Sequence, residues 1–170
     1  MQLYDIETIF AFLLAIVVHE LGHIIAIFLM GMRVKNVKLE LSGIKIEYSG
    51  IASEDSETFV ALCGPLAGIA YFLVIHKANA FFALSGELSL IYSFFNIMPI
   101  APLDGGRIIL LQTEKIDKED RINGFVYRAA AWFCVTFFVF GLINLLKGEG
   151  GGMFAAGIWL LLLQNETKVL

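Results

Sequence analysis

Two histidines and a glutamate lie within five residues of one another in the first apolar stretch of the chain: His19, Glu20 and His23. Side chains four positions apart leave the same side of a helix, so both imidazoles can bind one Zn²⁺ ion. The glutamate between them can take a proton from a water molecule that the metal activates. Burying His and Glu in an apolar segment is costly, which favours function over coincidence. The pattern therefore predicts a hydrolytic zinc site.

A zinc ion held by two histidines needs a third protein ligand, and Asp104 is the strongest candidate. This residue follows Pro99 and Pro102, which end a regular helix, and precedes Gly105 and Gly106, which allow close backbone approach. Irregular backbone at membrane depth is tolerated only where it is buried in protein or lines a wet cavity. The alternative for Asp104 is a helix N-cap. Beside the two histidines the ligand interpretation is favoured, because zinc compensates the charge of an intramembrane carboxylate.

The composition places these residues in an integral membrane protein. The chain has 170 residues, of which 58% are hydrophobic and 16% are charged, and its mean hydropathy is +0.79. These values are too apolar for a soluble domain of this size. We expect a single domain over residues 1–170, mainly α, built as a polytopic bundle of about five transmembrane helices. The predicted spans are 6–30, 58–75, 81–98, 125–146 and 153–163.

The basic residues predict how the chain is oriented in the membrane. The net charge of −4 gives no indication of nucleic-acid binding. With the predicted spans, one side of the membrane receives ten of the twelve basic residues, and only Lys77 and Lys147 lie on the other. The positive-inside rule then puts the N-terminus outside and the C-terminus in the cytosol. His19 and His23 lie in the second half of the first span, so the metal site is expected toward the cytosolic side.

Between the first two spans the hydrophobic pattern changes to an alternation over residues 37–48, with a turn at Ser42-Gly43. This alternation predicts a membrane-associated β-hairpin over residues 33–49. Such a hairpin can be a purely structural element that rests on the membrane surface. The alternative is a substrate clamp, because a protease that cuts a transmembrane helix must first unwind it and an exposed strand edge can hold the unwound segment. In that case Leu39 and Leu41 belong to the substrate-binding strand.

The two motifs together resemble those of a known family. His19-Glu20-Leu21-Gly22-His23 and the segment 96–107 are similar to the HExxH and Asn-x-x-Pro-x-x-Pro-Leu-Asp-Gly-Gly signatures of the site-2 protease family of intramembrane zinc metalloproteases. The likeness is greatest to its compact bacterial members, related to the sporulation site-2 protease. Gly64-Pro65-Leu66-Ala67-Gly68 also resembles an intervening Gly-Pro motif of that family. The resemblance covers residues from about Ile6 to Leu111, and the last two predicted spans carry no motif.

The resemblance implies that His19, His23 and Asp104 ligate one Zn²⁺ per chain and that Glu20 is the general base and acid. It also implies that Asn96 hydrogen-bonds the substrate backbone or the developing oxyanion. The alternative for Asn96 is a hydrogen bond between helices. Arg107 is interpreted as an anchor on the cytosolic side rather than as a catalytic group.

Two functions follow for this chain. The first is an intramembrane zinc endopeptidase in the plasma membrane of a bacterium, acting in regulated intramembrane proteolysis on a transmembrane or membrane-associated protein. The second is a catalytically inactive scaffold in the bilayer that binds client proteins. The intact Glu20 favours the first, because a scaffold has no need of a base between two metal ligands. Association into a homo-oligomer stays open.

Overall fold

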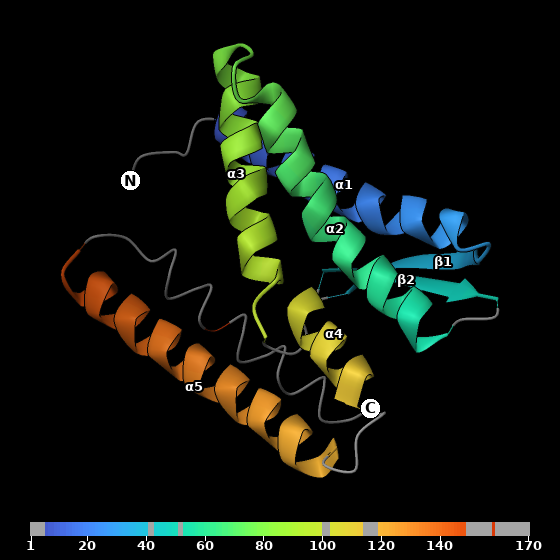
Figure 1. Ribbon diagram of the computed structural model, residues 1–170. Helices are drawn as coiled ribbons and strands as arrows, with labels where there is room; N and C mark the ends of the chain where they lie inside the picture. Colours follow the sequence, from blue (N-terminus) through green and yellow to red (C-terminus); the bar gives the residue numbers. More distant parts are fainter. Residues whose placement is uncertain are drawn as a thin grey trace.

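The computed structural model describes residues 6–40, 43–50, 53–99, 103–113, 119–148 and 158. Its elements are α1 (Ile6–Leu29), β1 (Arg33–Glu40), β2 (Gly43–Ser49), α2 (Glu54–Ile75), α3 (Ala80–Asn96), α4 (Asp104–Thr113) and α5 (Glu119–Leu146). Figure 1 shows α1, α2 and α3 packed together, with the two strands and α4 at one end and α5 on the far side of α4.

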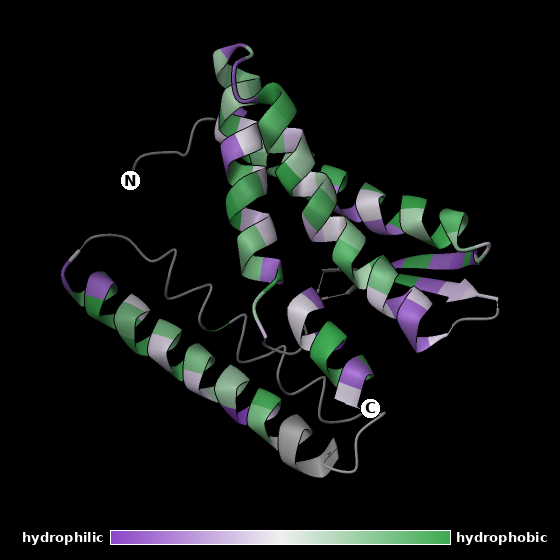
Figure 2. Cartoon of the chain, viewed as in Figure 1, coloured by the Kyte–Doolittle hydropathy of each residue, from purple (hydrophilic) through white to green (hydrophobic). Residues whose placement is uncertain are grey.

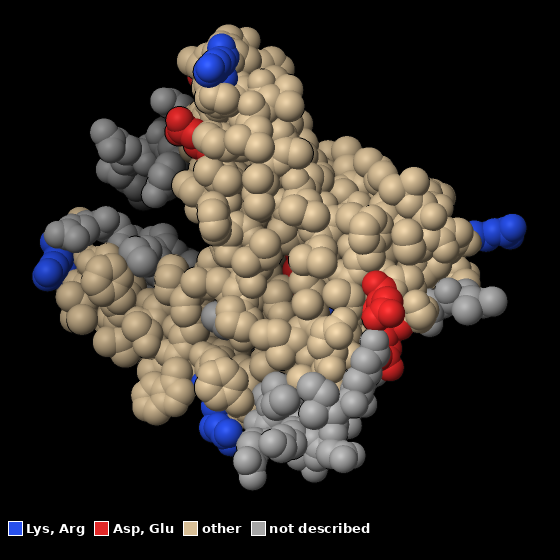
Figure 3. All heavy atoms as spheres, in the orientation of Figure 1, with Lys and Arg blue, Asp and Glu red and all other residues tan. Residues whose placement is uncertain are grey.

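Three helices of the described part of the chain are long and apolar enough to cross a membrane: α1, α2 and Gly124–Leu146 of α5. They coincide with three of the predicted spans, and α3 coincides with the predicted span 81–98. Since α3 has 17 residues, it is about 25 Å long at 1.5 Å per residue. The predicted span 153–163 lies outside the described residues, apart from Ile158. Apolar residues cover the helices in Figure 2, and on the face drawn in Figure 3 the charged side chains lie mostly toward the edges. The prediction of a mainly helical membrane protein is thus confirmed.

Small residues let the first three helices approach closely. A Cβ atom at Gly22 of α1 would overlap the carbonyl oxygen of Cys63 in α2, and one at Gly68 of α2 would overlap the hydroxyl groups of Ser89 and Ser93 in α3. Within a membrane, packing of this kind replaces the hydrophobic effect as the source of helix association. The three helices therefore form a closely packed unit on which the functional side chains can be held.

Helix α2 begins four residues before the predicted span at 58. Ser53 and Ser56 form a reciprocal cap, in which the Ser53 hydroxyl oxygen accepts from the Ser56 amide at 3.2 Å and the Ser56 hydroxyl oxygen accepts from the Ser53 amide at 2.8 Å. The first turn is acidic, which suits the positive end of the helix dipole. These polar residues extend the helix into water, which a hydropathy pattern does not detect.

The predicted β-hairpin is confirmed. Strands β1 and β2 pair antiparallel from Arg33↔Ser49 to Glu40↔Gly43, with an irregularity between Val34 and Asn36. One side of the hairpin packs on α1 and α2, because Val34, Ile46 and Tyr48 contact a buried cluster. That cluster consists of Ala26, Ile27, Met32 and Val60. The hairpin is therefore fixed to the same two helices that meet at the HExxH motif.

The segment after α3 contains a short helix that the sequence pattern did not predict. After the described residues end at Pro99, the chain resumes at Leu103 and enters α4 at Asp104. Leu103 and Ala130 of α5 are buried together, with Phe95, Met98 and Phe133 around them. Helix α5 begins at Glu119 rather than near 125, so part of the charged segment 114–121 is helical. Helix α4 thus lies between α2 and α5, with Asp104 at its start.

Candidate metal centre

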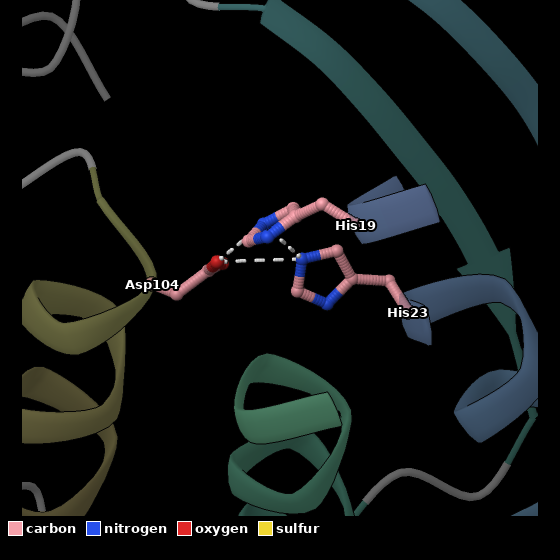
Figure 4. Close-up of side chains that lie close together, drawn as sticks. All are labelled: His19, His23 and Asp104. Carbon is pink, nitrogen blue, oxygen red and sulfur yellow. Dashed lines mark hydrogen bonds and ion pairs between the residues drawn. The ribbon is translucent and has the colours of Figure 1, made fainter. Parts of the chain in front are cut away.

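Three side chains from two helices converge beside the α1–α2 contact. His19 Nε2 lies 3.0 Å from Asp104 Oδ2, and His23 Nε2 lies 3.3 Å from His19 Nε2 and 3.4 Å from Asp104 Oδ2. The exposed fractions of these side chains are 2% for His19, 11% for His23 and 17% for Asp104. In Figure 4 both imidazoles of α1 point toward the carboxylate at the start of α4. The residues predicted as ligands are therefore neighbours in space, although 85 positions separate His19 from Asp104 in the sequence.

The orientation of His23 is set by helix α2. Its Nδ1 lies 2.8 Å from the carbonyl oxygen of Val60, so the Nδ1–H group donates to that oxygen and the Nε2 lone pair faces Asp104. A backbone acceptor of this type is a usual partner of a metal-binding histidine. Gly64 lies against the same ring, because a Cβ atom at this position would overlap Nε2 and Cε1 of His23. The Gly-Pro motif noted in the sequence therefore makes room for the imidazole.

His19 is held by rings instead. Its imidazole meets the His23 ring edge-to-face at 5.0 Å and the Tyr92 ring edge-to-face at 4.9 Å between centroids. Its Nδ1 atom is buried and has no hydrogen-bond partner among the described residues. Tyr92 is thus the residue that fixes one side of this imidazole. The only sequence signal for this role of Tyr92 is its position four residues before Asn96, on the same face of α3.

Asp104 is the first residue of α4 rather than the N-cap residue before it, and its carboxylate points toward the histidines. Gly105 lets the start of α4 lie against the end of α3, since a Cβ atom there would overlap the carbonyl oxygen of Ile97. The other end of α4 is tied to α2, where Gln112 Nε2 donates to Thr58 Oγ1 at 3.0 Å. The ligand is therefore presented by a short helix that α2 and α3 both position.

The three donors fit a zinc ion. In a tetrahedral site with zinc–ligand bonds of about 2.0–2.1 Å, neighbouring ligand atoms lie about 3.3 Å apart. The observed separations of 3.0, 3.3 and 3.4 Å agree with this spacing. Two imidazole nitrogens and one carboxylate oxygen are also a usual donor set for zinc. Because His23 donates through Nδ1–H, its Nε2 atom carries a lone pair that faces the Asp104 carboxylate. A cation between these two acceptors would satisfy both of them.

Glu20 is not among the three clustered donors. The half-buried Glu20 carboxylate interacts electrostatically with His23 and Asp104. Asn96 is buried at the end of α3, and its Nδ2 donates to the backbone carbonyl of Tyr92 at 2.9 Å. This bond lies within one helix, so among the described residues it is not the hydrogen bond between helices that was the alternative for Asn96.

Leu39, which together with Asn96 and Leu41 was predicted to bind substrate, lies near the end of β1. Leu39 pairs with Ile44 in the strand register, and Leu41 lies outside the described residues. Arg107, interpreted from the sequence as an anchor, contacts the hairpin: its Nη2 donates to the Tyr48 hydroxyl at 2.6 Å. The hairpin and α4 are thus in direct contact.

Similarity to known proteins agrees with this geometry. The chain is 28% identical over 172 residues to the candidate zinc metalloprotease sll0528 of Synechocystis sp., covering 89% of this chain and 43% of that protein. It is 31% identical over 143 residues to stage IV sporulation protein FB of Bacillus subtilis, covering 76% of this chain and 48% of that protein. The chain thus spans less than half the length of each of these curated relatives.

The fold also matches a solved structure. The site-2 protease from Methanocaldococcus jannaschii superposes with a TM-score of 0.74 at 19% identity, covering 97% of this chain and 79% of that one. The sequence profile of peptidase family M50 matches residues 56–142, which is just over half of the chain and includes Asn96 and Asp104. The chain therefore belongs to peptidase family M50, the family of the site-2 proteases.

Proposed function

We propose that this chain is an intramembrane zinc endopeptidase that hydrolyses peptide bonds of a transmembrane or membrane-associated protein. The observation that carries the proposal is the convergence of His19 Nε2, His23 Nε2 and Asp104 Oδ2 within 3.4 Å of one another, beside Glu20. Family membership supports the same chemistry. Three protein ligands leave one position open, which is the arrangement of catalytic rather than structural zinc sites.

In this proposal His19, His23 and Asp104 hold one zinc ion per chain. When bound, zinc supplies Lewis-acid activation of a water molecule and of the scissile carbonyl group. Glu20 is the general base and acid: its carboxylate takes a proton from the attacking water and returns it to the leaving amine. The half-buried Glu20 carboxylate interacts electrostatically with His23 and Asp104, which supports this role.

Asn96 is proposed to hold the substrate backbone or the oxyanion. A side-chain amide has two N–H donors, and the bond to the Tyr92 carbonyl uses one of them. The other can donate to a substrate carbonyl oxygen, which becomes more negative as the water attacks. Asn96 then contributes most in the transition state.

The hairpin is proposed as the substrate clamp. A two-stranded sheet has unpaired edges to which an extended segment can add as a further strand. The segment bound in this way is unwound, as hydrolysis of a helical substrate requires. Leu39 in β1, and Leu41 after it in the sequence, are the residues proposed to bind the substrate strand.

The protein is proposed to lie in a bacterial plasma membrane with its N-terminus outside, its C-terminus in the cytosol and the metal site toward the cytosolic side. The relatives from Synechocystis and Bacillus support a bacterial membrane. The sidedness rests on the ten basic residues of twelve that fall on one side of the predicted spans. Regulated proteolysis of a signalling protein is the process that the family resemblance favours.

The first test is the zinc content of the purified protein in detergent, measured by elemental mass spectrometry. We expect about one zinc per chain in the wild type and in Glu20→Gln, and loss of zinc in His23→Ala and Asp104→Ala. Glu20→Gln should also lower the hydrolysis of fluorescently labelled casein by at least about a hundredfold. A folded wild type without zinc, or a Glu20→Gln variant that cuts at the wild-type rate, would contradict the proposed function.

A further inference from the structure

Helix α4, which begins at Asp104, meets the hairpin at Arg107. This residue lies three positions after Asp104 on α4, and its Nη2 donates to the hydroxyl of Tyr48 in β2 at 2.6 Å. The guanidinium carbon also lies 6.0 Å from the centre of the Tyr48 ring. Residues three apart on a helix are neighbours on its surface. Any displacement of Asp104 therefore moves the group that holds Tyr48.

A third element joins at the same point. Arg107 Nη2 lies 3.6 Å from Glu57 Oε2, which is in the first turn of α2. The planar guanidinium has five donors in a rigid fork, so it can serve the hydroxyl and the carboxylate together. We call Arg107, Tyr48 and Glu57 the Arg107 bracket. The bracket joins β2, α2 and α4.

Tyr48 is itself fixed by packing, so the bracket holds α4 at a defined position relative to the hairpin. Its ring packs against the buried cluster that includes Val60, and the carbonyl of Val60 accepts the hydrogen bond from His23. The hairpin is thus linked to one metal ligand through Val60 and to another through Arg107. A substrate segment that adds to the hairpin therefore has a fixed position relative to His23 and Asp104.

We propose that Arg107 is a positioning residue that couples the hairpin to Asp104, so that filling the metal site and ordering the substrate-binding strands favour each other. This proposal rests on the proposed function of the metal site. Coupling of this kind is reciprocal: if metal binding orders the hairpin, an ordered hairpin raises the affinity for the metal. Through the bracket, the strands that bind substrate become ordered only when the metal site is filled.

The competing explanation is a surface ion pair without function. The Arg107 and Glu57 side chains are 44% and 30% exposed, and exposed pairs of this type contribute little to stability. A merely structural pair can change the stability of the fold, but it does not make the order of the hairpin depend on zinc. The dependence on zinc is therefore the quantity to measure.

The test is hydrogen–deuterium exchange of residues 33–49 in the full-length protein in detergent, with the metal removed by a chelator and with zinc added back. In the wild type, zinc should slow exchange of the hairpin amides by about two- to five-fold. Tyr48→Phe keeps the ring and removes the hydroxyl acceptor, so the zinc effect on the hairpin should disappear while the zinc content stays at the wild-type value. Arg107→Met should behave in the same way.

Gln112→Ala is the matched control, because it removes a side-chain bond between α4 and α2 without a contact to the hairpin. This variant should keep the zinc effect. Loss of the effect in Gln112→Ala to the same extent as in Tyr48→Phe would overturn the proposal, as would a zinc effect that persists in both bracket variants. Zinc content measured on the same samples separates the two proposals. Zinc bound to the wild type without a change in the hairpin contradicts the coupling alone, and absence of zinc contradicts the coupling and the proposed function together.

Discussion

The two histidines of the site are held by different means. His23 is fixed by a backbone acceptor on α2, whereas His19 is fixed by the edges of two rings. Both histidines and Asp104 could be predicted as a ligand set from sequence, because a spacing of four on a helix and an acid beside Pro and Gly residues are local patterns. Tyr92 could not be predicted with the same force, since a tyrosine in an apolar helix is usual and its contact with His19 depends on how α1 and α3 pack.

At the residue scale, we expect the contact between Tyr92 and His19 to raise the zinc affinity of the proposed site. Tyr92→Leu should lower the zinc affinity by about three- to ten-fold, because the ring that supports the imidazole is lost. Tyr92→Phe keeps the ring and should bind zinc nearly as the wild type does. Competition with a chromogenic chelator measures both affinities.

Phe12→Leu is the control for this prediction, because Phe12 meets Tyr92 edge-to-face at 6.0 Å and is not part of the metal cluster. It should leave the zinc affinity within about twofold of the wild type. Equal losses in Phe12→Leu and Tyr92→Leu would mean that general packing, and not support of His19, determines the affinity.

Gly64 gives a second prediction. An added methyl group there overlaps the His23 ring, so Gly64→Ala should displace the imidazole and weaken zinc binding by about ten- to a hundredfold. The control is Gly124→Ala in α5, where the nearest atom to an added Cβ is 3.5 Å away. This variant should bind zinc normally. Chelator competition measures the zinc affinity, and a thermal unfolding scan shows whether Gly64→Ala is folded. Normal zinc affinity in a folded Gly64→Ala variant would show that Gly64 is not needed to make room for the His23 imidazole.

At the scale of elements, the hairpin connects the fold to the proposed substrate. Its existence was predictable because alternation with a Ser-Gly turn is a local signal. Its docking on α1 and α2 was not, since Val34, Ile46 and Tyr48 meet a cluster drawn from three separate segments. The starts of α2 and α5 also differ from the predicted spans, because polar residues continue these helices beyond the apolar segments. A hydropathy pattern detects only the apolar part of a helix that can lie in lipid, and it does not detect the polar turns that continue the helix.

The clamp function is tested by a proline in β1. Leu39→Pro removes a backbone donor near the end of the ladder, where Leu39 pairs with Ile44, and it should lower casein hydrolysis by about tenfold or more. The zinc content should stay unchanged, since the substitution lies far along the hairpin from the metal ligands. Leu39→Thr is the control, because threonine is compatible with a strand. Full activity of the proline variant with an intact fold would exclude the clamp.

At the scale of the whole molecule, the two ends of α2 correspond to the two sides of the membrane in the proposed orientation. The capped start at Ser53 adjoins the hairpin, and the other end adjoins the turn that contains Lys77. The helix has 22 residues and is about 33 Å long, slightly more than the hydrocarbon thickness of about 30 Å, which agrees with a polar first turn outside the lipid. The arrangement of α4 and α5 around this unit could not be predicted from sequence, because it depends on contacts such as that of Leu103 with Ala130.

The proposed sidedness can be tested by labelling single cysteines. With Cys63 and Cys134 replaced by serine, Lys77→Cys should react with a membrane-impermeant maleimide in intact spheroplasts. Lys35→Cys, on the exposed side of β1, should react only after lysis, because the positive-inside rule places the hairpin in the cytosol. The opposite labelling pattern would reverse the orientation.

The separation of the metal donors along the chain has a consequence for biosynthesis. Helix α1 carries two of the proposed donors, but the third, Asp104, comes 85 residues after His19, in the helix that follows α3. A chain still being translated therefore has an incomplete set of ligands while the first three helices assemble. The last donor reaches the others only when α4 folds back against α2. Under the proposed function, the site that hydrolyses peptide bonds is therefore completed only after α4 has been synthesised and packed.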